Sequence, residues 1–211
     1  EKLRKWVDYA NRSGAVILYD AAYEIFIEDP DIPHSIFEIP SADTCAIEIC
    51  SLSKTAGFTG TRLGYTVVPK VLDRMGMNLN AMWARNRETR TNGISYILQK
   101  GASAVFTKEG LEQIQKNIRV YKENARVLMD AFERIGIWYC GGRNSPYVWL
   151  KCPDDMGGWE FFDYLLNEIQ VVGIPGEGFG ACGKGYFRFS AFGDPEDTKE
   201  AANRLCKLLG R

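Results

Sequence analysis

A polar, glycine-containing loop between two short apolar runs constrains the fold of this chain more than any other feature. The loop covers residues 51–64, and the apolar runs cover residues 45–50 and 63–68. Both runs contain β-branched or aromatic residues and are bounded by turn-forming residues, a pattern typical of strands. The sequence therefore predicts a polar loop that is held at the edge of a sheet by two buried strands.

The loop carries groups whose chemistry suits an anionic cofactor. The hydroxyls of Ser51 and Ser53, the backbone N–H groups of a glycine-rich turn and the planar guanidinium of Arg62 can bind a phosphate. Lys54 places a primary amine beside that anion site, and a primary amine condenses with an aldehyde. An aldehyde with a phosphate tail is what pyridoxal phosphate (PLP) offers, so the pattern indicates a PLP site. A surface turn with two solvated cations is the alternative.

The spacing of these residues resembles a known family motif. Ser51, Ser53 and Lys54, followed by Arg62, resemble the cofactor-lysine motif of the fold type I PLP enzymes, the aspartate aminotransferase-like family. Residues 54–69 (KTAGFTGTRLGYTVVP) are similar to the LL-diaminopimelate aminotransferases within that family. The resemblance implies that Lys54 carries the PLP cofactor, that Arg62 binds its phosphate, and that Ser51 and Ser53 join this phosphate site.

An aspartate ends the first continuous apolar run of the chain. Residues 15–19 are apolar and predict a strand buried on both faces of a parallel sheet, and Asp20 follows them directly. A carboxylate at the end of a buried strand is costly without a cationic partner, and a protonated pyridine nitrogen is such a partner. The family resemblance gives this role to Asp20, and gives Tyr23 a hydrogen bond to the ring oxygen of the cofactor. An Asp that caps the next helix, beside a core Tyr, is the alternative.

Arg188 lies between two phenylalanines in a predicted strand at residues 186–190, where it needs an anionic partner. A buried ion pair with a carboxylate of the same protein is one interpretation. In the aminotransferase family the arginine at this place binds the α-carboxylate of the substrate with both arms of its guanidinium. Residues 144–149, 175–180 and 187–193 also resemble the LL-diaminopimelate aminotransferases, so the likeness extends over nearly the whole chain.

The middle of the chain contributes one more candidate residue and the division into domains. Asn92 resembles the Asn that related aminotransferases present to the cofactor end of a partner subunit's site, although the residue ahead of it differs from the family pattern. Residues 71–77 predict the start of a helix. Apolar residues spaced three and four apart from Leu111 to Ile135 predict a long helix around residues 109–136. With no second segment of this kind, a helix that crosses between subdomains is favoured over a coiled coil.

The expected fold class is therefore α/β. The resemblance implies that residues 1–120 are the C-terminal part of the PLP-binding large domain of a fold type I transferase, a mostly parallel sheet flanked by helices. Residues 121–211 would follow as a small α+β C-terminal domain, joined to the first by the long helix.

Composition excludes several classes of protein. The 211 residues are 45% hydrophobic and 25% charged, which is ordinary for a globular protein, and a net charge of −1 argues against nucleic-acid or membrane partners. No apolar run approaches the length of a membrane span, and no signal peptide opens the chain. No metal-ligand spacing is present, so no metal is expected and the cysteines are expected to be reduced thiols of a cytoplasmic protein. These six are Cys45, Cys50, Cys140, Cys152, Cys182 and Cys206.

The resemblance also implies a reaction. The family's enzymes are much longer than this chain, which resembles their C-terminal half and is expected to be an incomplete enzyme. The implied reaction is PLP-dependent transamination between LL-diaminopimelate and 2-oxoglutarate in lysine biosynthesis. Tetrahydrodipicolinate is the keto-side partner of LL-diaminopimelate, and glutamate is the amino-side partner of 2-oxoglutarate. The full-length protein would be a homodimer. Another fold type I enzyme, such as an aspartate- or aromatic-type aminotransferase or a C–S lyase, and a non-catalytic fragment are the alternatives.

Overall fold

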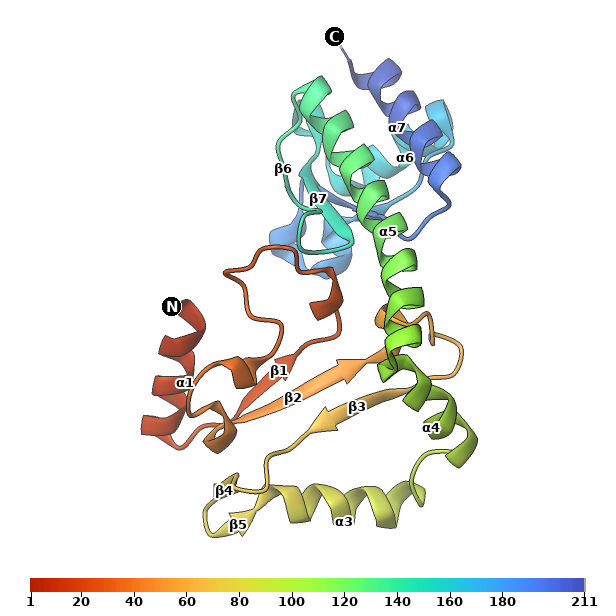
Figure 1. Cartoon of the computed structure of the whole chain (residues 1–211). Coiled ribbons are helices and arrows are strands. Elements are labelled where there is room, and N and C mark those ends of the chain that lie inside the picture. The colour runs from red at the N-terminus through yellow and green to blue at the C-terminus, as the bar shows by residue number, and fades with distance from the viewer. Residues whose placement is uncertain (211) are drawn as a thin grey trace. The chain divides into compact units, whose positions relative to one another are not determined.

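The computed structural model describes residues 1–210 of the chain, which divide into two compact units (Figure 1). The first unit contains residues 1–25 and 29–114, and the second contains residues 26–28 and the chain from residue 115 onward. Within the described residues, no helix is both long and apolar enough to cross a membrane.

The first unit is built on a three-stranded sheet in the order β1-β2-β3 (Figure 1). β1 (Ile17–Asp20) and β2 (Ala46–Ser51) are parallel, and β3 (Gly64–Val67) runs antiparallel to β2. The sheet is preceded by α1 (Lys2–Ser13), which ends at Gly14 in the left-handed conformation (φ 74°) that glycine adopts at helix ends. The strands predicted on both sides of the polar loop are thus confirmed.

Within residues 1–210, one face of β1 is covered and the other is exposed. Val7 and Ala10 of α1 pack with Ala46 in a buried cluster, and Ile17 and Tyr19 of β1 lie against the same cluster. Leu18, on the opposite face of β1, is 67% exposed. The prediction that residues 15–19 are buried on both faces is therefore wrong for residues 1–210, because side chains pack against only one face of β1 there.

The helix predicted from residue 71 is also wrong at its start. Residues 73–78 form a two-stranded hairpin, β4 (Asp73–Arg74) and β5 (Met77–Asn78), whose turn has positive φ at both Met75 and Gly76. Two central residues with positive φ are typical of the tight turns that join antiparallel strands. Helix α3 (Leu79–Thr91) begins only after this hairpin, with the Asn78 side chain accepting a hydrogen bond from the N–H of Ala81.

The remaining helices of the first half are short, and a long one follows them. α2 (Leu52–Thr55) and α4 (Tyr96–Ser103) have four and eight residues. α5 (Lys108–Ile135) has 28 residues and matches the predicted long helix within one residue at each end. Its apolar stripe includes Ile118, Leu128 and Phe132, which are almost fully buried.

The second unit is an antiparallel sheet packed against helices (Figure 1). The strands lie in the order β6-β7-β9-β8 and comprise β6 (Tyr139–Gly141), β7 (Tyr147–Lys151), β8 (Ile174–Pro175) and β9 (Tyr186–Ser190). Helices α6 (Gly158–Ile169) and α7 (Pro195–Leu209) complete the unit. Its core contains fully buried aromatic and aliphatic side chains from α5, the sheet and both helices: Phe132, Leu150, Phe161, Leu165, Phe187 and Leu205.

Candidate active site

The polar loop begins at the carboxyl end of β2. Ser51 is the last residue of β2 and Leu52 the first of α2, so Lys54 lies within a single helical turn directly after the strand. The buried side chain of Leu52 anchors this turn, and its N–H donates to the carbonyl of Leu63 at 3.1 Å. That bond closes the loop at its two ends, so the amine-bearing segment is tied to the strand on each side.

Asp20 ends β1 at the same edge of the sheet. In the parallel register Asp20 is paired with Ile49, and the N–H of Ala21 donates to the carbonyl of Ile49 at 2.8 Å. Because the carboxyl ends of parallel strands meet at one edge, Asp20 shares that edge with Ser51 and Lys54. The structure thus brings the predicted acid and the predicted lysine segment to one place in the fold.

Asp20 was interpreted either as the partner of a protonated ring nitrogen or as a cap of the next helix, and its surroundings bear on this choice. Its Oδ1 accepts a hydrogen bond from the N–H of Ala22 at 3.0 Å, a local turn bond, and the carboxylate is exposed. One such bond leaves acceptor capacity on the carboxylate for a second partner. Tyr23 is half-buried in the turn that leads to the short 3₁₀ helix Glu24–Phe26, so it is not a core tyrosine.

The serines and Arg62 line the loop itself. Ser51 Oγ accepts from the N–H of Ser53 at 3.2 Å, which leaves its hydroxyl hydrogen to donate elsewhere. Arg62 has φ 54°, is exposed, and donates one hydrogen bond to the carbonyl of Thr59 at 3.0 Å. A guanidinium has five N–H donors, so this bond leaves others for an anion.

A glycine is required where the loop returns to the sheet. A Cβ on Gly64 would lie 2.5 Å from the carbonyl oxygen of Cys50, a distance that side chains do not tolerate. Gly64 therefore allows β3 to begin directly beside the end of β2, and the loop to turn back tightly.

This set of donors fits PLP. An aldehyde needs an amine, its phosphate needs hydroxyl and guanidinium donors, and a protonated ring nitrogen needs a carboxylate. The edge formed by β1 and β2 carries Lys54, Ser51, Ser53 and Arg62 in one loop and Asp20 on the neighbouring strand. No group of three His, Cys, Asp or Glu side chains in residues 1–210 could hold a metal ion.

A buried carboxylate behind the loop was missed by sequence reasoning. Glu48 is 7% exposed, and its Oε2 accepts from the hydroxyl of Ser35 at 2.6 Å and the N–H of Ile36 at 2.9 Å. The thiol of Cys50 donates to its Oε1 at 3.6 Å. These bonds attach the segment after Tyr23 to the strand that leads to Lys54. The alternation of Glu48 with Ala46 and Cys50 places all three on one face, which was a signal that the sequence already contained.

The cysteines differ in accessibility, and this predicts a labelling pattern. Burial, with a contribution from the neighbouring Glu48, raises the pKa of the Cys50 thiol to about 11, and burial raises the pKa of Cys152 to about 11. Cys140 and Cys182 are exposed.

Since the thiolate is the reactive species, iodoacetamide at pH 8 is expected to alkylate Cys140 and Cys182 in the native protein and to spare Cys50 and Cys152. Peptide mass mapping checks this, with urea-denatured protein as the control in which every cysteine reacts. Equal rates for native Cys50 and Cys182 would contradict it.

Arg188 lies in the second unit, held between two aromatic rings. It is in β9, and its guanidinium carbon is 4.2 Å from the ring centre of Tyr147 and 4.5 Å from that of Phe179. Its Nε is buried and has no hydrogen-bond partner within residues 1–210, and none of the ion pairs among these residues includes Arg188. Within residues 1–210 the structure therefore shows no internal ion pair of Arg188, which was one interpretation of this arginine.

The two rings were not predicted as parts of the site. Tyr147 begins β7, and the pairing of β7 with β9 sets Trp149 opposite Arg188, so Tyr147 is two residues from that pair. Phe179 comes from the glycine-rich segment after β8. Both belong to segments that carried the family resemblance, yet only the sheet register and the loop path bring them to the guanidinium.

Asn92 takes a structural position at the end of a helix. It is the C-cap of α3, with φ 52°, and is exposed. Asn is among the few residues that tolerate the left-handed region, so this place accounts for Asn without a ligand. The predicted contact with a partner subunit's cofactor remains a prediction.

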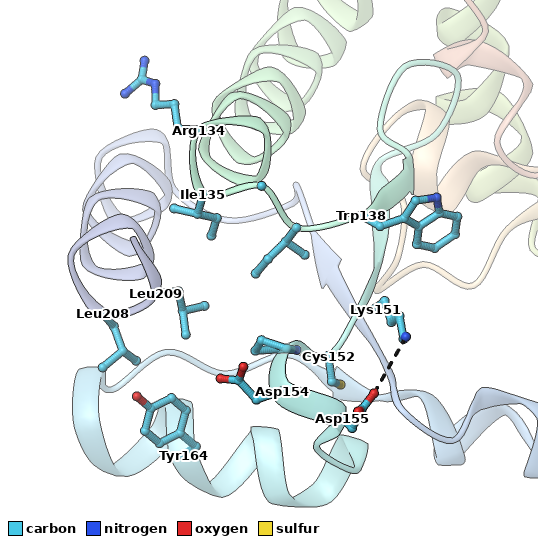
Figure 2. A pocket seen from close by; sticks show the side chains of 13 residues that line it. Arg134, Ile135, Trp138, Lys151, Cys152, Asp154, Asp155, Tyr164, Leu208 and Leu209 are labelled. Carbon is cyan, nitrogen blue, oxygen red and sulfur yellow. Dashed lines mark ion pairs between the residues drawn. The ribbon is translucent and has the colours of Figure 1, made fainter. Parts of the chain in front are cut away.

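A separate cleft of the second unit contains none of the predicted site residues. It has a volume of about 690 Å³, and Figure 2 shows its walls at the end of α5, the end of β7 and α7. The ion pair of Lys151 with Asp155, at 3.9 Å, lies on one side of it. This cleft adjoins the Lys151 end of β7, whereas Tyr147, which contacts Arg188, is at the opposite end.

Comparison with known proteins agrees with this chemistry. The family model for aminotransferase class I and II matches residues 1–205. An LL-diaminopimelate aminotransferase of Azobacteroides pseudotrichonymphae genomovar. CFP2 is 53% identical over 214 residues, which cover 99% of this chain and 53% of that protein. The enzyme of the same name from Lawsonia intracellularis is 52% identical, with 99% and 52% covered. The chain therefore spans about half the length of the curated relatives it matches.

Solved structures share the fold. The L,L-diaminopimelate aminotransferase from Chlamydomonas reinhardtii superposes with a TM-score of 0.92 at 43% identity, over 99% of this chain and 51% of that one. An aromatic aminotransferase from Pyrococcus horikoshii OT3 has a TM-score of 0.83 at 22% identity, over 98% of this chain and 54% of that one, a likeness of fold. The predicted α/β fold class of the fold type I transferases is confirmed. With its family match over residues 1–205, the chain belongs to the aminotransferase class I and II family, whose enzymes depend on PLP.

Proposed function

We propose that this chain is the cofactor-lysine half of an LL-diaminopimelate aminotransferase. The complete protein would exchange an amino group between LL-diaminopimelate and 2-oxoglutarate, with tetrahydrodipicolinate as the keto-side partner, in lysine biosynthesis. The observation that carries this proposal is the parallel register that sets Asp20 at the same sheet edge as Ser51 and Lys54. The 51–53% identity to several enzymes of that name supports the substrate class.

The two units would have separate tasks. Residues 1–120 would be the C-terminal part of the PLP-binding domain, and residues 121–211 the small domain, a division supported by the boundary between residues 114 and 115. The full-length protein would be a cytoplasmic homodimer, in which Asn92 faces the cofactor end of the partner subunit's site. Amino acids and 2-oxo acids would be its substrates, as for the family.

Each candidate residue has a defined task in this proposal. When bound, PLP supplies an electron sink that makes the α-carbon of the amino acid acidic. The freed amine of Lys54 would then act as general base and acid, moving the proton from the α-carbon to the cofactor carbon. The carboxylate of Asp20 would hold the proton on the ring nitrogen, and the hydroxyl of Tyr23 would donate to the ring oxygen.

The remaining groups would bind and orient. The phosphate would be held by the hydroxyls of Ser51 and Ser53 and by the guanidinium of Arg62. Hydrogen bonds to a charged phosphate are stronger than those between neutral groups. Arg188 would bind the α-carboxylate of the substrate with two N–H groups, because its guanidinium is planar and always charged.

Borohydride reduction in the presence of PLP tests the proposal on the chain as it is. Reduction converts the PLP–lysine linkage to a stable secondary amine, and peptide mass mapping is expected to find it on Lys54. Lys54→Arg should abolish the label, whereas Lys70→Arg, at an exposed lysine that follows β3, should not change it. A label confined to another lysine, or none in a version extended to the length of the relatives, would overturn the proposal.

A further inference from the structure

In the second unit, a carboxylate from the loop after β8 caps the N-terminus of α6. Oε1 of Glu177 accepts a hydrogen bond from the N–H of Gly158, the first residue of α6, at 3.0 Å. The N-cap of α6 is Gly157, which has no side chain to satisfy the first N–H groups of the helix. Backbone N–H groups, its own and that of Gly158, lower the pKa of Glu177. Glu177 therefore serves as a long-range cap that joins the loop after β8 to α6.

The backbone is built to admit this carboxylate. A Cβ on Gly158 would overlap Oε2 of Glu177, so only glycine lets the side chain reach the start of the helix. Gly176 and Gly183 are packed against each other so closely that a Cβ on either would overlap the backbone of the other. Residues 176–183 thus form a compact loop whose position depends on close backbone contact and on the Glu177 cap.

The same loop carries the ring that covers Arg188. Phe179 lies two residues after Glu177 in the 3₁₀ helix Gly176–Phe179, and its ring centre is 4.5 Å from the guanidinium carbon. Phe179 is 53% exposed, so burial of its own ring does not hold it in place. It also meets Trp149 edge-on, with ring centres 5.6 Å apart. Phe179 is therefore held over Arg188 by a loop that is attached to α6 through Glu177.

We propose that Glu177 is a positioning residue for carboxylate binding by Arg188. With one ring at 4.2 Å and the other at 4.5 Å, the guanidinium is restricted in rotation, and its N–H groups present one fixed plane to a ligand. The proposal rests on the proposed function in assigning the substrate carboxylate to Arg188.

The test follows the Nε–H resonance of Arg188 in ¹⁵N-labelled protein, assigned by its loss in Arg188→Lys. Titration with 2-oxoglutarate is expected to shift this resonance, whereas sodium chloride of equal ionic strength is not. Glu177→Ala should raise the apparent Kd about tenfold, the effect of losing one stacked or charge-assisted contact. Glu177→Gln, which keeps an oxygen acceptor for Gly158, should stay within about threefold of the wild type.

The matched control is Glu160→Ala. Glu160 is exposed, lies in the first turn of α6 and accepts a weak bond from the N–H of Gly157 at 3.4 Å, but it has no bond to the loop. The substitution Glu160→Ala should change the apparent Kd for 2-oxoglutarate by less than about twofold. Equal weakening by Glu160→Ala and Glu177→Ala would overturn the proposal, because loss of helix stability would then explain both.

Two further outcomes are decisive. Phe179→Ala keeps the cap and removes the ring, so it should reproduce the loss of affinity even if Glu177→Ala fails to fold; an unchanged Kd would refute the proposal. A wild-type Arg188 resonance that does not respond to 2-oxoglutarate would refute it as well. PLP labelling of Lys54 is measured on the same samples and tests the first unit separately, so failure of the proposed function is distinguished from failure of the positioning role.

Discussion

Replacement of Lys54 by Ala in a version of the protein extended to the length of its relatives is expected to lower kcat for transamination by at least ~10⁴-fold, since the lysine is both the covalent anchor and the proton carrier. The residue lies in the turn directly after β2, where Leu52 is buried and Lys54 is only half-buried, so the change should leave the fold intact. Loss of the PLP absorption band that depends on lysine attachment should accompany the loss of turnover.

Lys70→Ala is the matched control for this result. Lys70 is exposed and follows the same sheet, so its loss removes one positive charge without touching the loop. Its kcat should remain within about twofold of the wild type. Turnover by Lys54→Ala at more than one hundredth of the wild-type rate would exclude this lysine as the proton carrier.

Replacement of Asp20 by Asn should produce the second large effect. At ~3 Å and an effective dielectric constant of ~20, a carboxylate attracts a protonated ring nitrogen by about 5 kcal/mol before desolvation. That energy corresponds to about 4 pKa units of the ring nitrogen, at roughly 1.36 kcal/mol per unit. Without the charge the ring loses its proton near neutral pH, and kcat should fall by roughly 10³-fold while PLP still binds.

The charge of Asp20 also predicts the direction in which the activity of Asp20→Asn changes with pH. A carboxylate beside the ring nitrogen raises the pKa of that nitrogen, so the wild type keeps the proton as pH rises and Asp20→Asn loses it at lower pH. The residual activity of the variant should therefore increase as the pH is lowered. Asp43→Asn, at an exposed position in the turn before β2, is the control and should match the wild type. A tenfold or smaller loss in Asp20→Asn, with an unchanged pH profile, would remove Asp20 from the ring-nitrogen role.

Local features of the sequence determine several helix ends, the long helix and the polar loop. Gly14 ends α1 in the left-handed conformation, and Asp194 caps α7 with Pro195 in its first turn, because these residues satisfy helix ends through their own backbone freedom or side-chain oxygens. The apolar stripe of α5 gave the bounds of a 28-residue helix. The loop of Ser51 to Arg62 was recognisable because its chemistry is concentrated in a few consecutive residues.

The wrong predictions concern segments whose structure depends on contacts between residues far apart in the sequence. The segment predicted as a helix from residue 71 is a hairpin, in which the guanidinium of Arg74 donates to the carbonyls of Thr44 and Ala15, which are far away in sequence, at 2.9 Å each. Apolar residues 15–19 predicted burial on both faces, yet Leu18 is exposed because periodicity reports hydrophobicity and not the presence of a packing partner.

By itself, the sequence determined which chemical groups this protein has: an amine, two hydroxyls and a guanidinium in one loop, an acid at the end of a strand, and an arginine between phenylalanines. Only the tertiary structure decided their surroundings. Strand register sets Asp20 beside the lysine segment, and pairing of β7 with β9 and the loop after β8 place Tyr147 and Phe179 on the two sides of a guanidinium. Glu177 reaches Gly158 across 19 residues. Such contacts depend on how distant segments pack, and no local pattern of residues encodes them.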